Sequence, residues 1–280
     1  MPESAPQYCP SPVELDDLEL LLGRAVPGVD AFNAPGSPIT LRLPGPVAEQ
    51  ADAAGAVEIV DPEGLPLARV AWPAGTVEPL SHAAYGPFRR LRLTPEQYRA
   101  VHAGRTVVPV ADALTSAQLG SIAELGPVTL LTLDGTGTPV LSPVALVRAT
   151  LAAAALLDDA VVVTVPLASH GDPEVDHALG IEVVSAYVAG DPLHALADDE
   201  EGEYPAVIGE IVERDLPEPD QQGLVLFFTG LSGSGKSTLA RALLDKLLEQ
   251  GLRTVTSLDG DVVRRHLSAC LLYTSDAADE

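Results

Sequence analysis

The spacing of apolar residues near the start of the chain predicts one helix and several short strands. Leucines recur on one side of residues 14–22, which predicts a short amphipathic helix. Residues 38–43, 57–60 and 67–71 are apolar runs typical of strands, and residues 61–64 predict a turn between the last two. We therefore expect a small β-rich module in this part of the chain.

Further strand-like runs follow in the middle of the chain, at residues 105–110, 161–166 and 181–185. Their content of β-branched residues favours strands over loops. We interpret them as parts of an α/β core.

The C-terminal part of the chain alternates between strand and helix patterns. Residues 224–228 form an apolar run typical of a buried parallel strand. Residues 253–258, which are rich in β-branched side chains, predict a second strand. Between the two runs, leucines at four-residue spacing predict a helix that ends at Gly251: Leu239, Leu243 and Leu247.

Composition excludes several classes of protein. The 280 residues are 46% hydrophobic and carry a formal net charge of −24, which is enough apolar material to oppose disorder. The acidity excludes a free nucleic-acid-binding protein, which needs a basic face. No apolar stretch approaches about 20 residues, and the N-terminus lacks the pattern of a secretory signal. We therefore expect a cytoplasmic protein that contacts neither nucleic acid nor membrane.

The charge is unevenly distributed. Residues 1–222 contain 10 Arg, no Lys and 33 acidic residues, whereas residues 223–269 contain six basic and four acidic residues. An acidic run at residues 197–203 and a Pro-rich run at residues 217–223 separate the two regions and are typical of solvated linkers. This pattern predicts a domain boundary near residues 215–222.

Few side chains in the N-terminal region are candidates for metal binding. Only two cysteines occur, Cys9 and Cys270, which excludes a disulfide framework and a cysteine-rich metal site. Histidines scattered in an acidic segment are more often solvated than metal-bound, so we favour solvation for one short cluster: His170, Asp172, Asp176 and His177.

Residues 230–237 match the phosphate-loop pattern G-x-x-x-x-G-K-[ST] in full, between a predicted strand and a predicted helix. The glycines allow the backbone N–H groups to point at phosphate oxygens. Lys236 is suited to the β- and γ-phosphates of ATP, and the Ser237 hydroxyl to Mg²⁺. A glycine-rich turn that merely caps a helix is the disfavoured alternative. The predicted ATP-binding residues are Gly230, Leu231, Ser232, Gly233, Ser234, Gly235, Lys236, Ser237 and Thr238.

Two carboxylates, Asp259 and Asp261, follow the second predicted strand of this region. Reactive groups in open parallel sheets lie past the carboxyl ends of strands, so both are expected to face the phosphate loop. One carboxylate is suited to Mg²⁺ or its water shell and the other to orienting or deprotonating an acceptor hydroxyl, although an ordinary turn is the alternative. We therefore predict Lys236, Asp259 and Asp261 as catalytic. Asp261 and Arg264 are predicted to bind the second substrate.

The segments GLSGSGKST (residues 230–238) and LDGDVVRRHLS (residues 258–268) resemble adenylylsulfate kinase. The resemblance covers the first third of that P-loop kinase domain. It implies phosphorylation of the 3′-hydroxyl of adenosine 5′-phosphosulfate by MgATP in sulfate assimilation. Val262 stands where the family more commonly has Asn. The alternatives are a small-metabolite kinase of the gluconate-kinase type and a non-catalytic ATP-binding scaffold.

Three N-terminal pieces, DLELLL, PITL and VEIVDPEGLPLA, are similar to the PUA-like N-terminal domain of ATP sulfurylase. That resemblance implies a catalytic signature, Gln-x-Arg-Asn-Pro-x-His-x-x-His, after a buried strand. Residues 111–116 follow such a strand and contain no Arg, Asn-Pro or histidine pair. We therefore expect a degenerate sulfurylase-like region that acts as a scaffold or regulator. Partners implied by the resemblance are a second copy of the chain or other sulfate-activating enzymes.

Residues 270–280 resemble the translation of a transposase-type sequencing adapter. We expect that the parent protein continues beyond Ala269 with native sequence and that the chain as written is inactive. The predicted fold class is α/β, with a PUA-like β-rich module, a degenerate sulfurylase-like α/β region and an incomplete P-loop kinase domain. The expected boundaries are 1–75, 76–215, a linker at 216–222, 223–269, and the adapter-like tail at 270–280.

Overall fold

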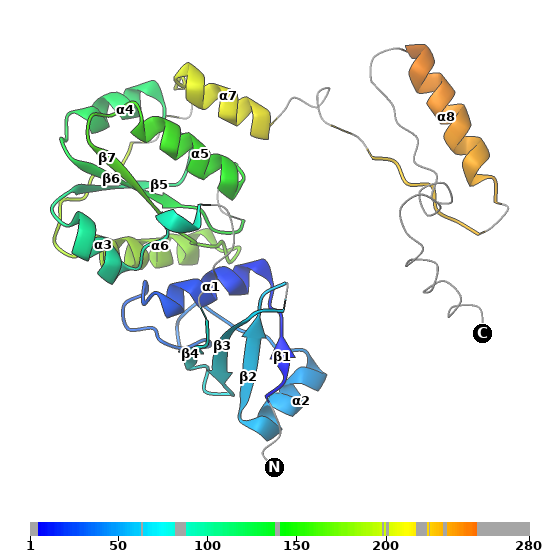
Figure 1. Cartoon of the computed structure of the whole chain (residues 1–280), viewed down its shortest axis with the longest axis horizontal. Coiled ribbons are helices and arrows are strands. Elements are labelled where there is room, and N and C mark those ends of the chain that lie inside the picture. The colour runs from blue at the N-terminus through cyan, green and yellow to red at the C-terminus, as the bar shows by residue number, and fades with distance from the viewer. Residues whose placement is uncertain are drawn as a thin grey trace. The chain divides into compact units, whose positions relative to one another are not determined.

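A computed structural model describes residues 5–62, 64–81, 88–137, 141–197, 199, 202–216, 223, 225–231 and 234–250. The chain divides into two compact units, residues 1–220 and residues 221–280, and this division lies within the predicted linker (Figure 1). No helix in these ranges has the length and apolar character needed to cross a membrane.

The N-terminal unit begins with a four-stranded sheet in the order β1-β2-β3-β4. β1 pairs with β2 in parallel, and the other pairs are antiparallel. The predicted helix at residues 14–22 and the predicted strands at 57–60 and 67–71 are confirmed. We call this part the first module; its elements are β1 (Gln7–Tyr8), α1 (Pro12–Leu22), α2 (Gly45–Ala54), β2 (Ala56–Val60), β3 (Pro66–Ala71) and β4 (Val77–Pro79).

Residues 38–43 form no strand, so that prediction was wrong. The Asn33 side chain donates to the Leu41 carbonyl at 3.3 Å and accepts from the Leu41 amide at 3.2 Å. The Arg42 amide donates to Glu14 Oε1 at 2.9 Å. Because side chains satisfy these backbone groups, the segment needs no partner strand. Ile39 and Leu41 are buried all the same, which explains their apolar character.

A second sheet follows, with three parallel strands in the order β5-β6-β7. Helices α3 and α6 pack on one face of it, while α4 and α5 pack on the other and α7 packs against α5 (Figure 1). We call this part the second module; its elements are η1 (Arg89–Leu91), α3 (Pro95–His102), β5 (Thr106–Val110), α4 (Ser116–Ala123), β6 (Val128–Leu133), α5 (Pro143–Ala154), β7 (Ala160–Val165), α6 (Pro173–Val188) and α7 (Ala206–Asp215).

The predicted strands at residues 105–110 and 161–166 are confirmed, but residues 181–185 are helical. They lie inside α6, where Leu179, Val183 and Tyr187 are buried. These residues recur every four positions, which matches the period of a helix rather than that of a strand. The Ile181–Ser185 run was too short to distinguish the two periods.

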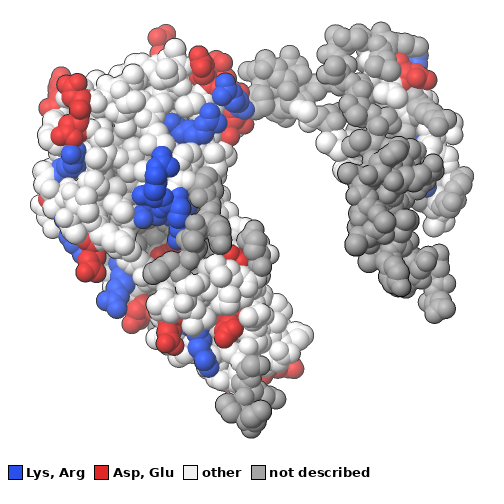
Figure 2. Space-filling model, in the orientation of Figure 1, with Lys and Arg blue, Asp and Glu red and all other residues white. Residues whose placement is uncertain are grey.

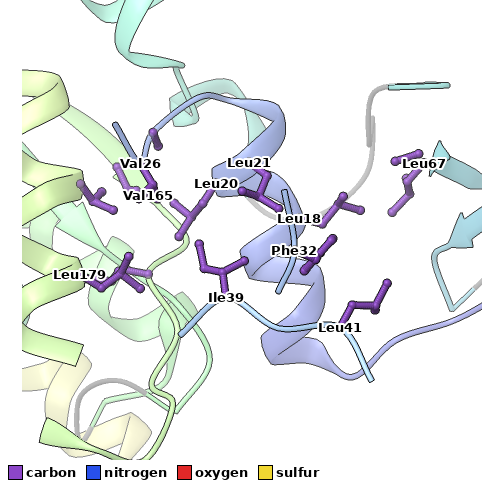
Figure 3. Close-up of a cluster of buried hydrophobic side chains, with 14 of the residues drawn as sticks. Leu18, Leu20, Leu21, Val26, Phe32, Ile39, Leu41, Leu67, Val165 and Leu179 are labelled. Atoms are coloured by element: carbon purple, nitrogen blue, oxygen red, sulfur yellow. The ribbon is translucent and has the colours of Figure 1, made fainter. Parts of the chain in front are cut away.

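The two modules of the N-terminal unit share one hydrophobic core. Leu18 and Leu20 of α1 belong to the same buried cluster as Val165 of β7 and Leu179 of α6 (Figure 3). Burial of each such side chain contributes roughly 1.5–3 kcal/mol to folding. The modules therefore fold as one unit, joined largely by α1.

The acidic run at residues 197–203 was predicted to be solvated. Ala197 and Glu203 are exposed, whereas Asp199 and Gly202 are half-buried, and the run makes hydrogen bonds to the second module. Asp199 Oδ2 accepts from Thr115 Oγ1 at 2.6 Å, and the Glu203 carbonyl accepts from the Ser116 amide at 2.8 Å. A Cβ atom on Gly202 would collide with the Asp199 carboxylate and with Thr115. The run thus packs closely at the N-terminus of α4, where a carboxylate is favourable.

The C-terminal unit contains helix α8 (Lys236–Gln250), which confirms the helix predicted from the leucine spacing. Its predicted end at Gly251 lies outside the described residues. The strand predicted at residues 224–228 is not found in the described part, residues 225–228. Val225 is 73% exposed and Phe227 86% exposed, and no strand among the described residues pairs with them. The predicted strand at 253–258 and the tail at 270–280 also lie outside the described residues.

Candidate phosphate-binding site

The phosphate loop lies at the N-terminus of α8. Gly230 has a φ of +145° and Gly235 a φ of +83°, conformations that glycine adopts without strain. The Ser234 amide donates to the Leu231 carbonyl at 3.2 Å, so the backbone reverses direction within the loop. A Cβ atom on Gly230 would come within 3.1 Å of Ser234 Oγ. The positive φ, together with this tight contact, favours glycine at the first position of the loop.

Lys236 is the first residue of α8, and its side chain turns back over the loop. Its Nζ donates to the Gly230 carbonyl at 2.9 Å and to the Leu231 carbonyl at 2.7 Å. The ammonium group thus lies beside the first residues of the loop, where the sequence pattern requires a cation. A phosphate oxygen there would accept a charge-assisted hydrogen bond, which is stronger than one to a neutral carbonyl.

The first turn of α8 is suited to an anion. Its unpaired N–H groups and the helix dipole place partial positive charge there, and the turn contains no acidic residue. Ser237 and Thr238 are exposed in this turn, so their hydroxyls are accessible to a ligand. The described loop residues fit ATP with Mg²⁺: Lys236 for the phosphates and Ser237 for the metal.

The other predicted site residues lie outside the described residues. These are Ser232, Gly233, Asp259, Asp261 and Arg264, and their roles remain predictions. The structure therefore brings together Gly230, Leu231, Ser234, Gly235 and Lys236 with Ser237 and Thr238 following in the helix.

A polar cluster that the sequence analysis missed lies at the carboxyl ends of β6 and β7. Glu19 of α1 forms ion pairs with Arg89 and Arg92. Arg92 also pairs with Asp134 at 3.4 Å. Asp16 accepts from the backbone amide and the hydroxyl of Thr136 at 2.8 and 2.6 Å. The sequence did contain a signal for this cluster: three neighbouring acids, Asp16, Asp17 and Glu19, lie inside a leucine-rich helix. Acidic residues are normally on a solvated face, so their position among leucines was unusual.

Burial perturbs the carboxylates of this cluster. It raises the pKa of Asp134 from 3.8 to about 6, against an opposing effect of Arg92. It also raises the pKa of Asp17 from 3.8 to about 6. One oxygen of Asp134, Oδ1, has no hydrogen-bond partner among the described residues. Keeping Asp17 and Asp134 ionised in the folded protein therefore costs free energy, and other interactions in the fold must offset this cost.

Three residues of the histidine cluster noted in the sequence, His170, Asp172 and Asp176, make hydrogen bonds or ion pairs within the protein. No group of three or more His, Cys, Asp or Glu side chains among the described residues is arranged to hold a metal. Asp172 instead caps α6, accepting from the Glu174 and Val175 amides at 3.0 and 3.3 Å. His170 was expected to be solvated, but its side chain is only 12% exposed and it contacts two carboxylates.

Residues 111–116, where a sulfurylase signature was expected, have a structural role. Ala113 and Leu114 are buried in the core of the second module. The Thr115 side chain caps α4 and forms a capping box with Gln118.

On the face of the N-terminal unit visible in Figure 2, acidic and basic side chains are interspersed with uncharged ones.

Comparison with known proteins identifies relatives of the C-terminal unit. Residues 222–280 match the family model described as adenylylsulphate kinase. An adenylyl-sulfate kinase from Chloroflexus aurantiacus is 56% identical over 59 residues, which are 21% of this chain and 31% of that protein. A sulfate adenylyltransferase from Aspergillus terreus is 41% identical over 73 residues, which are 26% of this chain and 13% of that protein. The chain thus spans about a third of the length of the first of these relatives.

A solved structure shares the fold over most of the chain. The structure titled hexameric APS kinase from Thiobacillus denitrificans aligns with a TM-score of 0.60 and 22% identity, covering 95% of this chain and 74% of that chain. Because the C-terminal unit is only residues 221–280, the likeness in fold must include the N-terminal unit. The predicted α/β class is thereby confirmed.

Proposed function

We propose that this protein phosphorylates the 3′-hydroxyl of adenosine 5′-phosphosulfate with MgATP, giving 3′-phosphoadenylyl sulfate and ADP in sulfate assimilation. One observation carries the proposal: a phosphate loop with Lys236 folded over it lies in the segment that matches the adenylylsulphate kinase family. Relatives that bear the name adenylyl-sulfate kinase support the choice of substrate.

ATP binds through the loop at residues 230–237 and the first turn of α8. Lys236 exchanges its carbonyl partners for β- and γ-phosphate oxygens, and the loop amides bind the same phosphates. The Ser237 hydroxyl would hold Mg²⁺, which would neutralise negative charge on the phosphates.

In the proposed reaction, the 3′-oxygen of the sulfonucleotide forms a bond to the γ-phosphorus. The bond from that phosphorus to the oxygen it shares with the β-phosphate breaks, and ADP leaves with the electron pair. Asp259 and Asp261 supply one carboxylate for the water shell of Mg²⁺ and one to accept the hydroxyl proton. Arg264 binds an anionic group of the sulfonucleotide.

ADP release by the purified protein tests this proposal. With MgATP we expect ADP release that depends on adenylylsulfate and not on gluconate or shikimate. Turnover with one of the other acceptors alone would assign the protein to the small-metabolite kinases. ATP binding without acceptor-dependent release would favour a nucleotide-sensing scaffold.

The proposed role of the N-terminal unit is that of a non-catalytic sulfurylase-like scaffold, with the first module corresponding to a PUA-like domain. The buried and capping roles of residues 113–115 support this, because they leave the expected signature positions without catalytic side chains. We expect no pyrophosphate release that depends on both ATP and sulfate. Such release from the purified protein would overturn the assignment.

A cytoplasmic location and self-association are further parts of the proposal. The neighbour titled hexameric APS kinase supports a homo-oligomer, and relatives named sulfate adenylyltransferase support association with other sulfate-activating enzymes. Light scattering coupled to size-exclusion chromatography tests the first: a monomer at micromolar concentration would contradict it.

A further inference from the structure

Three buried oxygen atoms at the carboxyl end of the second sheet have no hydrogen-bond partner among the described residues: Thr132 Oγ1, Thr164 Oγ1 and Asp134 Oδ1. The three residues are 0%, 1% and 7% exposed, respectively. Buried polar atoms are normally paired, and an exception calls for an explanation such as an ion or a water molecule. Three exceptions at one end of one sheet therefore indicate a bound group.

The register of the sheet puts these oxygens at neighbouring positions. Thr132 of β6 and Thr164 of β7 are direct partners in adjacent parallel strands. Their side chains lie on the face that α4 and α5 cover, because Leu130, two positions before Thr132, belongs to the core of that face. The Asp134 amide continues the ladder by donating to the Val165 carbonyl at 2.9 Å. Asp134 thus follows Thr132 at the period of a strand, on the same face and at the edge where open parallel sheets generally bind ligands.

The charges around Asp134 favour a cation over an anion. Arg92 pairs with Asp134 Oδ2 at 3.4 Å, which leaves Oδ1 for another partner. Asp16 and Glu19 add two carboxylates that act on Asp134, and Arg89 pairs with Glu19. Three carboxylates and two guanidinium groups sum to a net charge of −1. A water molecule would satisfy the unpaired oxygens but would leave this buried charge without compensation.

We propose that Thr132, Asp134 and Thr164 bind a monovalent cation, Na⁺ or K⁺, which joins β6 to β7 at their carboxyl ends. Carboxylate and hydroxyl oxygens are hard ligands, which suit ions of this kind better than they suit transition metals. A single positive charge balances the net charge of the cluster. Mg²⁺ keeps several water molecules and Ca²⁺ takes about six to eight oxygen ligands, so both require more room or more ligands than this buried group offers.

Thermal unfolding of the full chain in different salts tests the proposal. The fluorescence of Trp72, the only tryptophan of the chain, reports unfolding of the N-terminal unit, because this side chain packs against its core. The probes are NaCl, KCl and choline chloride at pH 8, each at about 150 mM so that the screening of charges is the same. We expect Tm to be about 3–5 °C higher in NaCl or KCl than in choline chloride, because a ligand that binds only the folded state raises Tm.

Substitutions at the site should remove the difference between the salts. Thr132→Val replaces a hydroxyl by a methyl group of similar size, and we expect the difference in Tm to fall below about 1 °C. Thr164→Val and Asp134→Asn should have the same effect, and they keep the test valid if Thr132→Val does not fold. Thr129→Val is the matched control: the Thr129 hydroxyl lies on the opposite face of β6 and accepts from Tyr98 Oη at 3.1 Å. This control should lose stability and keep the full difference between the salts.

Three results would count against the cation. An equal Tm of the unsubstituted chain in all three salts would overturn the proposal and assign the unpaired oxygens to bound water. A difference that persists in Thr132→Val, Thr164→Val and Asp134→Asn would show that the ions act elsewhere, and would overturn it as well. A rise of Tm with MgCl₂ or CaCl₂ but with neither alkali salt would overturn the choice of a monovalent ion.

Discussion

The two units of the chain differ in how far their apolar side chains are covered. In the N-terminal unit, Leu18 and Leu146 are no more than 1% exposed. Among the described residues of the C-terminal unit, Phe227 and Leu231 are 86% and 85% exposed. Yet the C-terminal unit carries the most specific motif in the sequence, while the N-terminal unit carries only weak resemblances. A phosphate loop is a local requirement met by eight consecutive residues, whereas a core depends on residues far apart along the chain.

The largest expected effect tests whether the phosphate-loop motif is catalytic. Lys236→Ala removes the ammonium group that lies over the loop and that we propose contacts the transferring phosphoryl group. We expect adenylylsulfate-dependent ADP release to fall about a hundred- to thousandfold, or roughly 3–4 kcal/mol in transition-state stabilisation. The only other lysine, Lys246, lies in the same helix, and Lys246→Ala is the control. An unchanged rate in Lys236→Ala would show that this loop is not the catalytic phosphate site.

Two leucine substitutions, one in each unit, measure how much the burial of apolar side chains contributes to the stability of each unit. Leu18→Ala creates a cavity in the shared core of the two modules and should lower the free energy of unfolding by about 3 kcal/mol. Leu239→Ala, at a side chain 62% exposed in α8, should change it by no more than about 0.5 kcal/mol. Urea denaturation followed by circular dichroism reports the helices of both units. Similar losses in the two variants would mean that α8 is covered as fully as α1.

Local signals predicted α1, α8 and the strands β2, β3, β5 and β7, because the causes of these elements lie within the elements themselves; the other helices and strands were not predicted. Ser11 and Glu14 at the start of α1 form a capping box, and the leucine stripe continues through the helix. Residues 38–43 were mispredicted because the deciding contacts come from outside the segment, and residues 181–185 because the run alone is too short to show the helical period. In the first case Asn33 and Glu14 replaced a partner strand, and in the second the run belonged to a longer helical pattern.

The same contrast between local and remote causes applies to the functional residues and to the buried polar cluster. The phosphate loop was identifiable because its residues are consecutive. The cluster of Asp16, Asp134 and Arg92 was not, because nothing in the sequence indicates that α1 lies against the loops after β6 and β7. Acids placed between leucines are ordinarily assigned to solvent, and only the fold buries them.

The buried carboxylate of Asp134 offers a pH test of the N-terminal unit. Its pKa is raised from 3.8 to about 6, so its contribution to stability is full below 3.8 and is lost as the pH rises through about 6. The whole effect is on the order of 2–3 kcal/mol. Asp134→Asn should therefore make the free energy of unfolding fall less steeply between pH 4 and pH 6. Urea titrations at intervals of half a pH unit measure this slope, and an unchanged slope would contradict the assignment.

The smallest expected effect concerns the acidic run that packs against α4. Gly202→Ala places a methyl group against Asp199 and Thr115, and we expect a loss of about 1 kcal/mol as these side chains shift. Gly120→Ala, inside α4 with open space around its Cβ position, should instead stabilise the protein by about 0.5–1 kcal/mol. Thermal unfolding distinguishes opposite signs readily. Equal effects from the two substitutions would indicate that Asp199 and Gly202 do not pack against α4.

The side chains of Asn33 and Glu14 bond the backbone of residues 38–43 where a partner strand would otherwise do so. They also affect the tendency of the protein to aggregate at high concentration. An apolar segment with free backbone N–H and C=O groups at the border of a sheet can recruit the same segment from another molecule and begin a cross-β aggregate. Asn33 occupies both groups of Leu41, and Glu14 occupies the amide of Arg42. The segment PITLRL therefore keeps its apolar residues for the core while its backbone offers little to a neighbouring chain. A loss of Asn33 would first be noticed as precipitation during expression.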